Sequence, residues 1–398
     1  MMTMKQQVNF TDMHKVLFGV DSFIKQADSF KNARIGFVTN NAATTSNGEL
    51  SRKALLIEGF TIIKLFSPEH GLTTKGKDGA YQSNSTDAYT QLPVVSLYGE
   101  HLMPSAEDMA DIDIILFDIP DAGCRFYTYL WTMTYIMEAC AIHNKPLIIL
   151  DRPNPISGNI KKAEGPMLDE KNCSSFIGRW NIPLRHSCTM GELATYFSAS
   201  RKIDIDLTII PLTHWNRNQL PAENNWKFTA TSPAISTINT ALCYPGTGLF
   251  EGFTINEGRG SDTPFTICGA PWINNTLLIN KINELQLPGI QFSSITYTPT
   301  ESLYAGECCF GLSLSITDES IFLPAQTGIE IIQQLLLLFP DHCQERLYKT
   351  VANPSGEKHA DKLLGIEKSF LRMKEGTKII TELNDNWENS ITPSLLYH

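Results

Sequence analysis

Residues 113–155 read DIILFDIPDAGCRFYTYLWTMTYIMEACAIHNKPLIILDRPNP and contain two short apolar runs, at Asp113–Phe117 and Pro146–Leu150. The stretch between them, Tyr127–His143, has the length and composition of a helix. Bulky runs without alternation are typical of parallel strands that are buried on both faces of a sheet. The segment therefore predicts a β-α-β unit, in which a helix covers two parallel strands.

The same pattern extends through the rest of the N-terminal half. Three further apolar runs predict strands at Arg34–Thr39, Thr61–Phe66 and Pro93–Leu97. Helix-like stretches lie between or after them, at Glu49–Glu58, Ser105–Ala110 and Met190–Ser198. Strands that alternate with helices predict an α/β fold with a Rossmann-like, doubly wound parallel sheet.

A Pro-, Asn- and Trp-rich passage, Pro211–Pro233, has little periodicity and marks the expected crossing into a second, smaller domain. A chain of 398 residues also exceeds the size at which one hydrophobic core usually stops growing. We therefore expect a Rossmann-like catalytic domain at 1–212 and an α+β domain at 213–398 that completes the cleft. The elements expected in this second domain are strands at Gln291–Tyr297 and Gly311–Thr317 and helices at Asn274–Leu285, Thr327–Phe339 and Thr377–Asn389.

The chain is acidic, with 32 basic and 42 acidic residues and a net charge of -10. Such a charge opposes binding to nucleic acid and anionic membranes, so we expect neither as a partner. The first residues, MMTMKQQVNFTDMHKVLF, lack the apolar core of an export signal, and no segment has the ~20 apolar residues that a membrane span needs. As given, the chain is expected in the cytoplasm, or in the periplasm or outside the cell if an export signal has been removed.

Polar residues follow each of the five predicted strands of the N-terminal half. In an open parallel sheet, ligands bind beyond the carboxyl ends of the strands, so these residues are the first candidates for a site. Two of the motifs also have simpler interpretations, since Pro68–Gly71 could be a surface turn and Arg152 could only pair with Asp151 or Asp118 in a rigid loop. The candidates are Asn40, Asn41, Glu69, His70, Tyr98, Asp121, Arg125, Asp151, Arg152 and Asn154, and Tyr127 could face the same crevice.

The second half contains one unusual segment, Tyr244–Trp272, which reads YPGTGLFEGFTINEGRGSDTPFTICGAPW. Its six glycines allow close approach of the backbone to a ligand and positive φ angles. The segment is either a ligand-binding loop or a structural Ω-loop. Its candidate site residues are Glu251, Asn256, Glu257 and Arg259.

Several familiar cofactor motifs are absent from the sequence. Gly246-x-Gly248 has no third glycine at dinucleotide spacing, and there is no G-K-[ST] phosphate loop. The nine cysteines form no C-x-x-C pair and have no zinc-site spacing, so we expect reduced thiols. The remaining chemistry is acid/base work by carboxylates, arginines, histidines and tyrosines on a polar, anionic substrate, with no metal and no organic cofactor.

The ordered motifs of this chain resemble those of the NamZ-type exo-β-N-acetylmuramidases. The resemblance runs from IGFVTNNA through FSPEHG, PVVSLYGEHLMP, FDIPDAGCRFYTYLWT, LDRPNPISG and the Tyr244–Trp272 segment to the terminal SLLYH. It implies a Rossmann-like domain joined to a smaller one, with the active site between them. The implied activity is hydrolysis of a β-1,4-linked N-acetylmuramoyl residue at the non-reducing end of peptidoglycan fragments. The family often has glycine where Ser187 stands here.

The family's proposed catalytic glutamate lies in the PEHG motif, so it carries over to Glu69. Glycoside hydrolysis needs an acid that protonates the departing oxygen and usually a second group that activates water or attacks the sugar. We expect Glu69 to be the general acid and His70 to hydrogen-bond Glu69 or the substrate. The second group stays open between Asp121, Glu251, Glu257 and Tyr127, and the substrate's own N-acetyl group could also take part.

Muramic acid differs from glucosamine by a lactyl ether that carries a carboxylate. Guanidinium groups bind carboxylates in a bidentate manner, so we expect one or two of Arg125, Arg152 and Arg259 to bind the lactyl group. Two alternative functions are a hydrolase or transferase for a phosphorylated or nucleotide-linked sugar, and a non-catalytic muropeptide-binding protein. Nucleotide affinity would favour the first alternative, and binding without turnover would favour the second.

Overall fold

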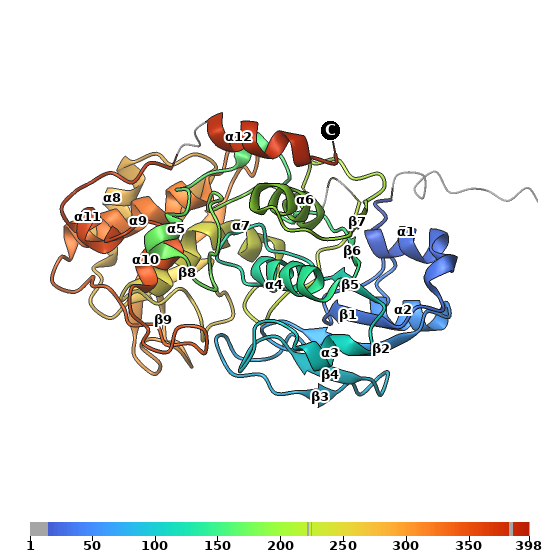
Figure 1. Ribbon diagram of the computed structural model, residues 1–398. Coiled ribbons are helices and arrows are strands. Elements are labelled where there is room, and N and C mark those ends of the chain that lie inside the picture. The colour runs from blue at the N-terminus through green and yellow to red at the C-terminus, as the bar shows by residue number, and fades with distance from the viewer. Residues whose placement is uncertain (1–14, 221–222, 224, 382–384, 398) are drawn as a thin grey trace, which may run out of the picture.

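The computed structural model describes residues 15–220, 223, 225–381 and 385–397. A sheet of seven strands forms the larger part of the molecule, in the spatial order β3-β4-β2-β1-β5-β6-β7 (Figure 1). All neighbouring strands are parallel except β3 and β4. The strands are β1 (Ile35–Thr39), β2 (Ile62–Ser67), β3 (Ser85–Thr86), β4 (Pro93–Ser96), β5 (Ile114–Asp118), β6 (Leu147–Leu150) and β7 (Leu207–Ile210).

The five strands predicted from the sequence are all present, within one residue at each end. Without the short edge strand β3, the parallel strands have the spatial order typical of a Rossmann sheet. The order in which successive strands are added to the sheet reverses between β1 and β5. The two central strands are paired in register from Ile35 with Ile114 to Thr39 with Asp118. The prediction of a doubly wound parallel sheet is therefore confirmed.

Helices cover both faces of this sheet because alternate strand residues point to opposite sides. Phe117 and Ile149 belong to the hydrophobic core that contains α4 and α6, whereas Leu116 and Ile148 belong to a second core with α1 and α2. α1 had not been predicted. The helices of this part are α1 (Gly19–Gln26), α2 (Ser51–Ile57), α3 (Ala106–Ala110), α4 (Tyr129–His143), α5 (Glu170–Cys173) and α6 (Met190–Arg201).

A smaller antiparallel sheet in the order β8-β10-β9 forms the second part of the molecule. Its strands are β8 (Ile267–Ala270), β9 (Ile290–Tyr297) and β10 (Cys309–Ile316), and its helices are α7 (Ile238–Thr247), α8 (Asn275–Glu284), α9 (Pro324–Leu338), α10 (His359–Leu364) and α11 (Ser369–Lys374). α7 and α9 can cross closely because Gly246 has no side chain. A Cβ at this position would lie only 2.0 Å from the carbonyl oxygen of Pro324. The expected α+β character is confirmed.

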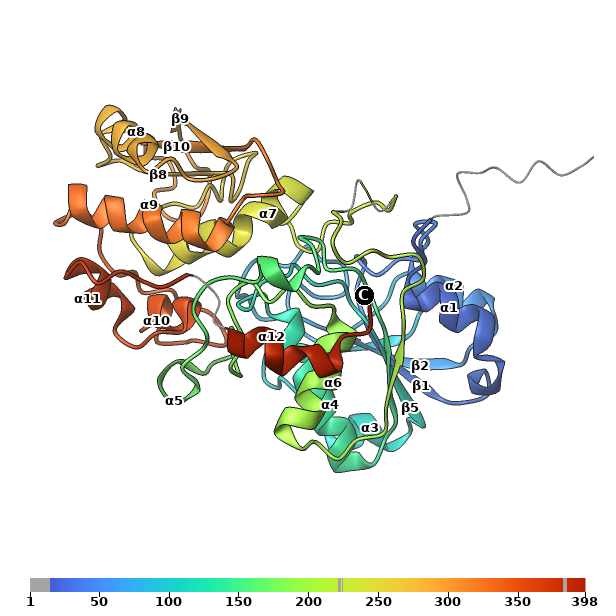
Figure 2. The same cartoon turned by 90° about the horizontal axis from the view of Figure 1, so that it is seen from above.

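The C-terminal segment differs from the prediction. A helix was expected at Thr377–Asn389, but residues 377–381 are not helical, and α12 covers Asp385–Ile391. Residues 382–384 lie outside the described part of the chain. α12 contacts α6, so the end of the chain returns to the Rossmann-like sheet (Figure 2). The division at residues 212 and 213 stays a prediction.

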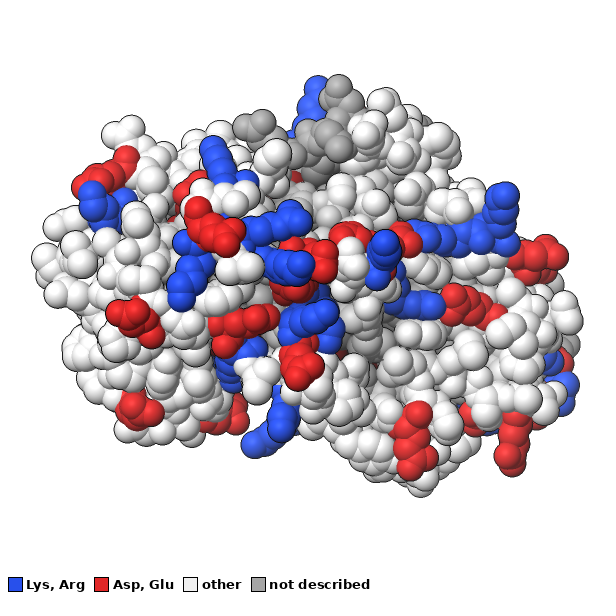
Figure 3. Space-filling model, turned by 60° about the vertical axis from the view of Figure 1, so that its left-hand side comes forward, with Lys and Arg blue, Asp and Glu red and all other residues white. Residues whose placement is uncertain are grey.

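Two further sequence-based expectations concern the thiols and the membrane. Eight of the nine cysteines are buried and Cys308 is exposed, and none of the nine is paired in a disulfide. Within the described residues, no helix has both the length and the apolar character needed to cross a bilayer. On the face shown in Figure 3, Lys and Arg side chains are interspersed with Asp and Glu.

Candidate active site

A narrow cavity of about 40 Å³ lies beyond the carboxyl end of β2, between the two parts of the molecule. Glu69 and His70 enter it from the turn that follows β2, and Tyr127 and Thr128 from the start of α4. The second part of the molecule contributes the remaining wall. The polar residues of the lining are Glu69, His70, Asp78, Tyr98, Tyr127, Thr128, Tyr244, Glu251, Tyr348, Thr350 and His359.

Glu69 is held in the cavity by two hydrogen bonds. Oε1 accepts from the backbone N–H of Gly79 at 2.8 Å, and Oε2 accepts from the hydroxyl of Thr128 at 2.7 Å. The residue is only 5% exposed. Burial, together with the negative charge of Asp78, raises the pKa of Glu69 above its usual value. A carboxyl group with a raised pKa retains its proton at higher pH and can therefore act as a general acid.

His70 lies beside Glu69 but is positioned by a different partner. Its Nδ1 lies 2.8 Å from the carbonyl oxygen of Gly76, so Nδ1 carries the hydrogen and donates it. The backbone of His70 has a φ of 65°, in the left-handed region, which turns the chain sharply after Glu69. Nε2 is thus the ring nitrogen that remains for a substrate. No hydrogen bond links His70 to Glu69, so of the two expected roles substrate contact is the one that this geometry leaves open.

Asp78 lies in the same cavity, although it was not among the predicted site residues. It follows no strand but belongs to the loop Lys75–Gly79, which reads KGKDG. The hydroxyl of Tyr348 donates to Oδ2 at 2.5 Å, and the guanidinium of Arg259 lies 3.2 Å from Oδ1. The only signal in the sequence was the short distance along the chain from the PEHG motif, and that distance does not show which way the loop folds.

Glu69, His70 and Asp78 form a compact group, in which one donor or acceptor atom from each residue lies within 4.8 Å of the others. A group of this size could in principle hold a cation. The guanidinium of Arg259 already lies next to the carboxylate of Asp78, however, and supplies a positive charge to it. The group therefore suits a hydrogen-bonding organic substrate better than a metal ion, and we assign no metal ligands here.

Activity should accordingly survive exhaustive dialysis against EDTA with kcat and KM unchanged. The expectation follows from the charge of the site, because a second cation beside a guanidinium would be repelled. The measurement is the steady-state rate before and after dialysis. A loss of activity that one divalent ion restores would show that the site depends on a metal.

The narrow cavity shares His70, Asp78 and Tyr348 with a much wider one of about 560 Å³. The wider cavity is bordered by Lys75 and Lys77 from the loop after Glu69 and by residues from the second part of the molecule. Its other lining residues are Gly76, Pro233, Ala234, Arg259, Gly260, Ser261, Pro264, Glu301 and Ser302. A narrow end joined to a wide opening suits a substrate of which one terminal unit is bound deeply.

Arg259 lines the wider cavity, but carboxylates surround its guanidinium. It lies 2.9 Å from Glu251, 3.2 Å from Glu257 and 3.2 Å from Asp78. Glu257 is fully buried, and burial together with the charge of Glu251 raises its pKa to about 7. The Tyr244–Trp272 segment thus places an arginine among acids beside the cavity. It also contains the end of α7 and all of β8, so it is not a simple Ω-loop.

Comparison with known proteins assigns the chain to a family. The family models described as exo-beta-N-acetylmuramidase NamZ, N-terminal and C-terminal, match residues 35–239 and 242–393. The chain belongs to the NamZ family. A curated member, the peptidoglycan beta-N-acetylmuramidase NamZ of Bacillus subtilis (strain 168), is 39% identical over 330 residues, which are 82% of this chain and 79% of that protein.

Two solved structures of DUF1343 family proteins from Bacteroides fragilis NCTC 9343 share the fold of this NamZ family member. One has a TM-score of 0.85 at 26% identity and covers 97% of this chain and 100% of its own. The other has a TM-score of 0.73 at 25% identity and covers 96% and 99%. Ser187 has a left-handed backbone, with a φ of 56°, a conformation that glycine adopts without steric cost.

Arg125 does not reach the cavity of this NamZ family member. It is fully buried, and its guanidinium donates to the carbonyl oxygens of Pro166, Ile182 and Leu363 at 2.6 to 3.0 Å. Burial lowers its pKa to about 10. Because these carbonyl groups take three of its donors and Arg125 lines neither cavity, the prediction that Arg125 binds a substrate carboxylate is not supported by its position, and we interpret the residue as structural.

Arg152 and Asp151 are also held by the protein itself. Arg152 forms a buried ion pair with Asp118 and donates to the carbonyl oxygen of Thr44 at 2.6 Å. Asp151 accepts hydrogen bonds from Thr189, Gly191 and Tyr397, and burial raises its pKa to about 6. Of the two pairings expected as alternatives to substrate binding, with Asp151 or with Asp118, Arg152 therefore forms the one with Asp118.

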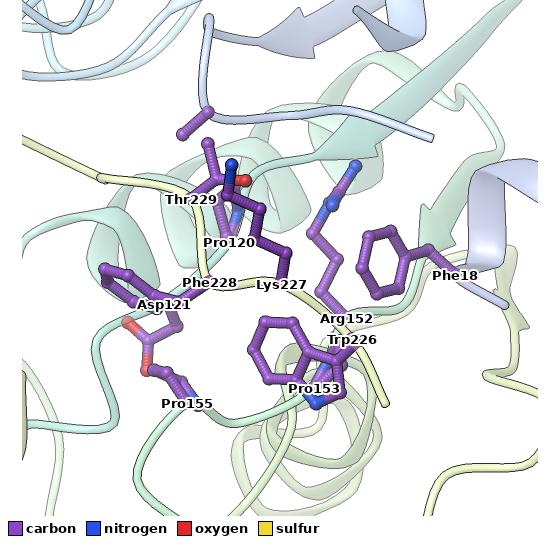
Figure 4. Close-up of a pocket in the computed structure, with 11 residues that line it drawn as sticks. Phe18, Pro120, Asp121, Arg152, Pro153, Pro155, Trp226, Lys227, Phe228 and Thr229 are labelled. Carbon is purple, nitrogen blue, oxygen red and sulfur yellow. The ribbon is translucent and has the colours of Figure 1, made fainter. Parts of the chain in front are cut away.

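Asp121 lies in a separate small cavity of about 20 Å³, shown in Figure 4, whose walls include Phe18, Arg152 and Trp226. Its Oδ2 accepts from the backbone N–H of Gly123 at 2.9 Å and contacts His186 Nε2 at 3.0 Å. Asp121 is not among the residues that line the Glu69 cavity. The reversal point of the sheet and the Glu69 cavity are thus two different places.

Three of the asparagines predicted as site residues instead stabilise their own loops. Asn40 accepts from the N–H of Ala42, Asn154 from that of Ile156 and Asn256 from that of Gly258. A fourth, Asn41, accepts from Arg52. These contacts give the four residues structural roles. Tyr98, Tyr127 and Glu251 do line the Glu69 cavity, and Glu257 lies behind Arg259.

Proposed function

We propose that this chain hydrolyses β-linked N-acetylmuramic acid from the non-reducing end of peptidoglycan-derived glycans or muropeptides, with Glu69 as the general acid. The main support for this proposal is the buried carboxyl group of Glu69. Its pKa is raised, and it lies in a narrow cavity that opens into a wide one. A terminal sugar in the wide cavity, at the end bordered by His70 and Asp78, would place its glycosidic oxygen near Glu69. The rest of the glycan would extend toward the opening of the wide cavity, which is the arrangement that exo-hydrolysis requires.

The membership of the NamZ family supports this proposal, because the curated relative bears the name peptidoglycan beta-N-acetylmuramidase. A nucleotide-linked sugar is less well supported. Dinucleotide-binding Rossmann domains hold the pyrophosphate at a helix N-terminus directly after the first strand. Here β1 is followed by Asn40 and Asn41, and α2 begins only at Ser51.

The direct test is incubation with a chromogenic β-N-acetylmuramide and with the matching N-acetylglucosaminide. We expect release of the chromophore from the muramide and a much lower rate with the glucosaminide. Binding of the muramide without turnover would support the alternative of a binding protein. Turnover only of a phosphorylated or nucleotide-linked sugar would support the other alternative.

We expect the lysines of the wide cavity, rather than Arg259, to favour muramic acid over glucosamine. Arg259 is surrounded by acids, whereas Lys75 and Lys77 lie at the rim, and Lys77 has only a loose ion pair of 3.7 Å with Glu301. Lys75→Met or Lys77→Met should raise KM for the muramide by about 10-fold, the size of one charged hydrogen bond. The KM for the glucosaminide should scarcely change.

The variant Arg259→Lys should behave differently from the two lysine variants. Because Arg259 contacts Asp78, its replacement should lower turnover of both substrates alike. Lys281→Met is a suitable control, since Lys281 pairs with Glu284 on α8, away from both cavities. A selective loss of muramide binding in Arg259→Lys alone would show that Arg259, and not a lysine, contacts the lactyl group.

A further inference from the structure

The proposed acid Glu69 needs a second group, and the structure brings Asp78 into the same cavity. We infer that Asp78 is the second catalytic carboxylate, which stays ionised beside the protonated Glu69 and attacks the anomeric carbon of the sugar. This inference rests on the glycosidase function proposed above. It names a residue that does not follow a strand and that the sequence motifs do not mark.

The distance between the two carboxylates is the first argument. Their donor or acceptor atoms lie within 4.8 Å of each other. In glycosidases that retain the configuration of the sugar, the two carboxyl groups are about 5–5.5 Å apart, whereas inverting enzymes leave about 6.5–9.5 Å for a water molecule. The short separation here leaves no room for such a water, so it favours direct attack by Asp78 and retention.

The loop that carries Asp78 is built to hold this position. Gly79, the next residue, has a φ of 63° and donates its N–H to Glu69. A Cβ at Gly79 would lie 2.6 Å from the side chain of Thr350, so the loop also packs tightly against the second part of the molecule. One tight turn therefore orients both carboxylates together.

The surrounding charges shift the pKa values of the two carboxyl groups in opposite directions. Burial alone would raise the pKa of Asp78, but the charges of Arg259 and His70 and the hydrogen bond from Tyr348 outweigh it and hold the pKa below its usual value. Burial and the charge of Asp78 have the opposite effect on Glu69. The titratable and charged groups that interact with the pair are His70, Tyr98, Tyr129, Tyr244, Arg259, Tyr348 and His359. Two carboxyl groups with divergent pKa values are the usual basis for separate acid and nucleophile roles.

The other predicted partners are less well placed than Asp78. Asp121 lines a different cavity, and Glu257 is fully buried behind Arg259. Glu251 does line the cavity, but its Oε1 accepts hydrogen bonds from Nε and Nη2 of Arg259, at 3.1 and 2.9 Å, and it does not belong to the compact group that Asp78 forms with Glu69 and His70. Asp78 is thus the acid that combines access to the cavity with proximity to Glu69.

The reaction would proceed in two balanced steps. In the first, an Asp78 oxygen forms a bond to C1 while the C1–O bond to the leaving group breaks, and Glu69 gives its proton to the leaving oxygen. In the second, water attacks C1 and displaces Asp78, while the water gives a proton to Glu69. The carboxylate and the acid are both regenerated, and the released sugar keeps the β configuration.

The experiment compares Asp78→Asn and Glu69→Gln on two muramides, one with an activated phenol as leaving group and one with a sugar. An activated phenol leaves without protonation, so Glu69→Gln should retain much of its rate on it. Asp78→Asn should lose about 10³-fold in kcat on both substrates, since the attacking charge is absent in either case. Glu284→Gln is the control variant and should behave as wild type, because Glu284 lies on α8 and lines neither cavity.

Three readouts distinguish a nucleophile from a residue that only supports the fold. Added azide or formate should restore turnover of the activated substrate to Asp78→Ala, because a small anion can occupy the vacated space. The acidic limb of the pH profile should disappear in Asp78→Asn, and the first product of the wild type should be the β anomer by NMR. Circular dichroism and thermal unfolding confirm that each variant is folded.

Specific results would overturn the inference. These are near-normal turnover by Asp78→Asn, an α anomer as the first product, or a folded Asp78→Ala that no anion reactivates. Failure of the wild type to hydrolyse either muramide would instead contradict the proposed function. The two failures are therefore distinguishable in one set of assays.

Discussion

Replacing Glu69 with Gln should lower kcat on a muramoyl disaccharide by about 10²–10⁴-fold, the range that general acid catalysis contributes. Gln keeps the shape of the side chain and can still accept the hydrogen bonds from Gly79 or Thr128, but it cannot donate a proton to the leaving oxygen. The stability of the protein should change little. The measurement is kcat for wild type and variant on the same disaccharide.

The pH profile gives a second readout of the same prediction. Because Glu69 must be protonated to act and its pKa is raised by burial, wild-type activity should be lost as the pH rises through that pKa. This basic limb should be absent from the residual activity of Glu69→Gln. Glu100→Gln is the matched control, since Glu100 is an exposed glutamate just beyond β4. A near-normal rate of Glu69→Gln on the disaccharide would contradict the role of Glu69.

Removing Asp118 should have the largest effect on stability. Asp118→Ala leaves the guanidinium of Arg152 buried without a counter-ion, since the two side chains are 0% and 4% exposed. Loss of one partner of a buried ion pair costs about 3–5 kcal/mol in the free energy of unfolding. Urea unfolding would show this cost as a lower midpoint at an unchanged slope.

Asp113→Ala is the matched control, at the residue directly before the same strand. Asp113 pairs with Arg34, but both side chains are about half exposed, so its loss should cost no more than about 1 kcal/mol. The double variant Asp118→Ala/Arg152→Met should be less destabilised than the sum of the single variants, because each single variant leaves a charge unpaired. If Arg152→Met unfolds like wild type and only raises KM for the muramide, Arg152 binds substrate and our structural interpretation is wrong.

The sequence was a good guide wherever the determining interactions are local. The continuous apolar runs predicted all five central strands, and Glu69, two residues after β2, lies in the cavity as expected for a strand end. The helix expected at Thr377–Asn389 was wrong in its first residues because its apolar pattern reflects contacts with other elements and not helical periodicity alone. Tyr98 and Tyr127 line the cavity with Glu69, as their places near strand ends indicated.

The arginines show the limit of this reasoning. Arg125 and Arg152 follow strands, as Glu69 does, yet their guanidinium groups bind partners within the protein: the carbonyl oxygen of Leu363 for Arg125, and Asp118 for Arg152. A strand end places the backbone at the edge of the sheet, but it does not determine whether a long side chain turns toward solvent or into the protein. That choice depends on which acceptors lie nearby after folding.

The sequence by itself determined the parallel sheet, the strand ends and the family, because hydrophobic runs and ordered motifs are properties of neighbouring residues. Only the tertiary structure decided which acids act together. Asp78 reaches Glu69 through a tight turn, and its charge depends on Arg259 and Tyr348, which lie about 180 and 270 residues away in the chain. The ionisation of a carboxyl group is set by the burial and charges around it, and in this protein the groups that supply them come from distant segments.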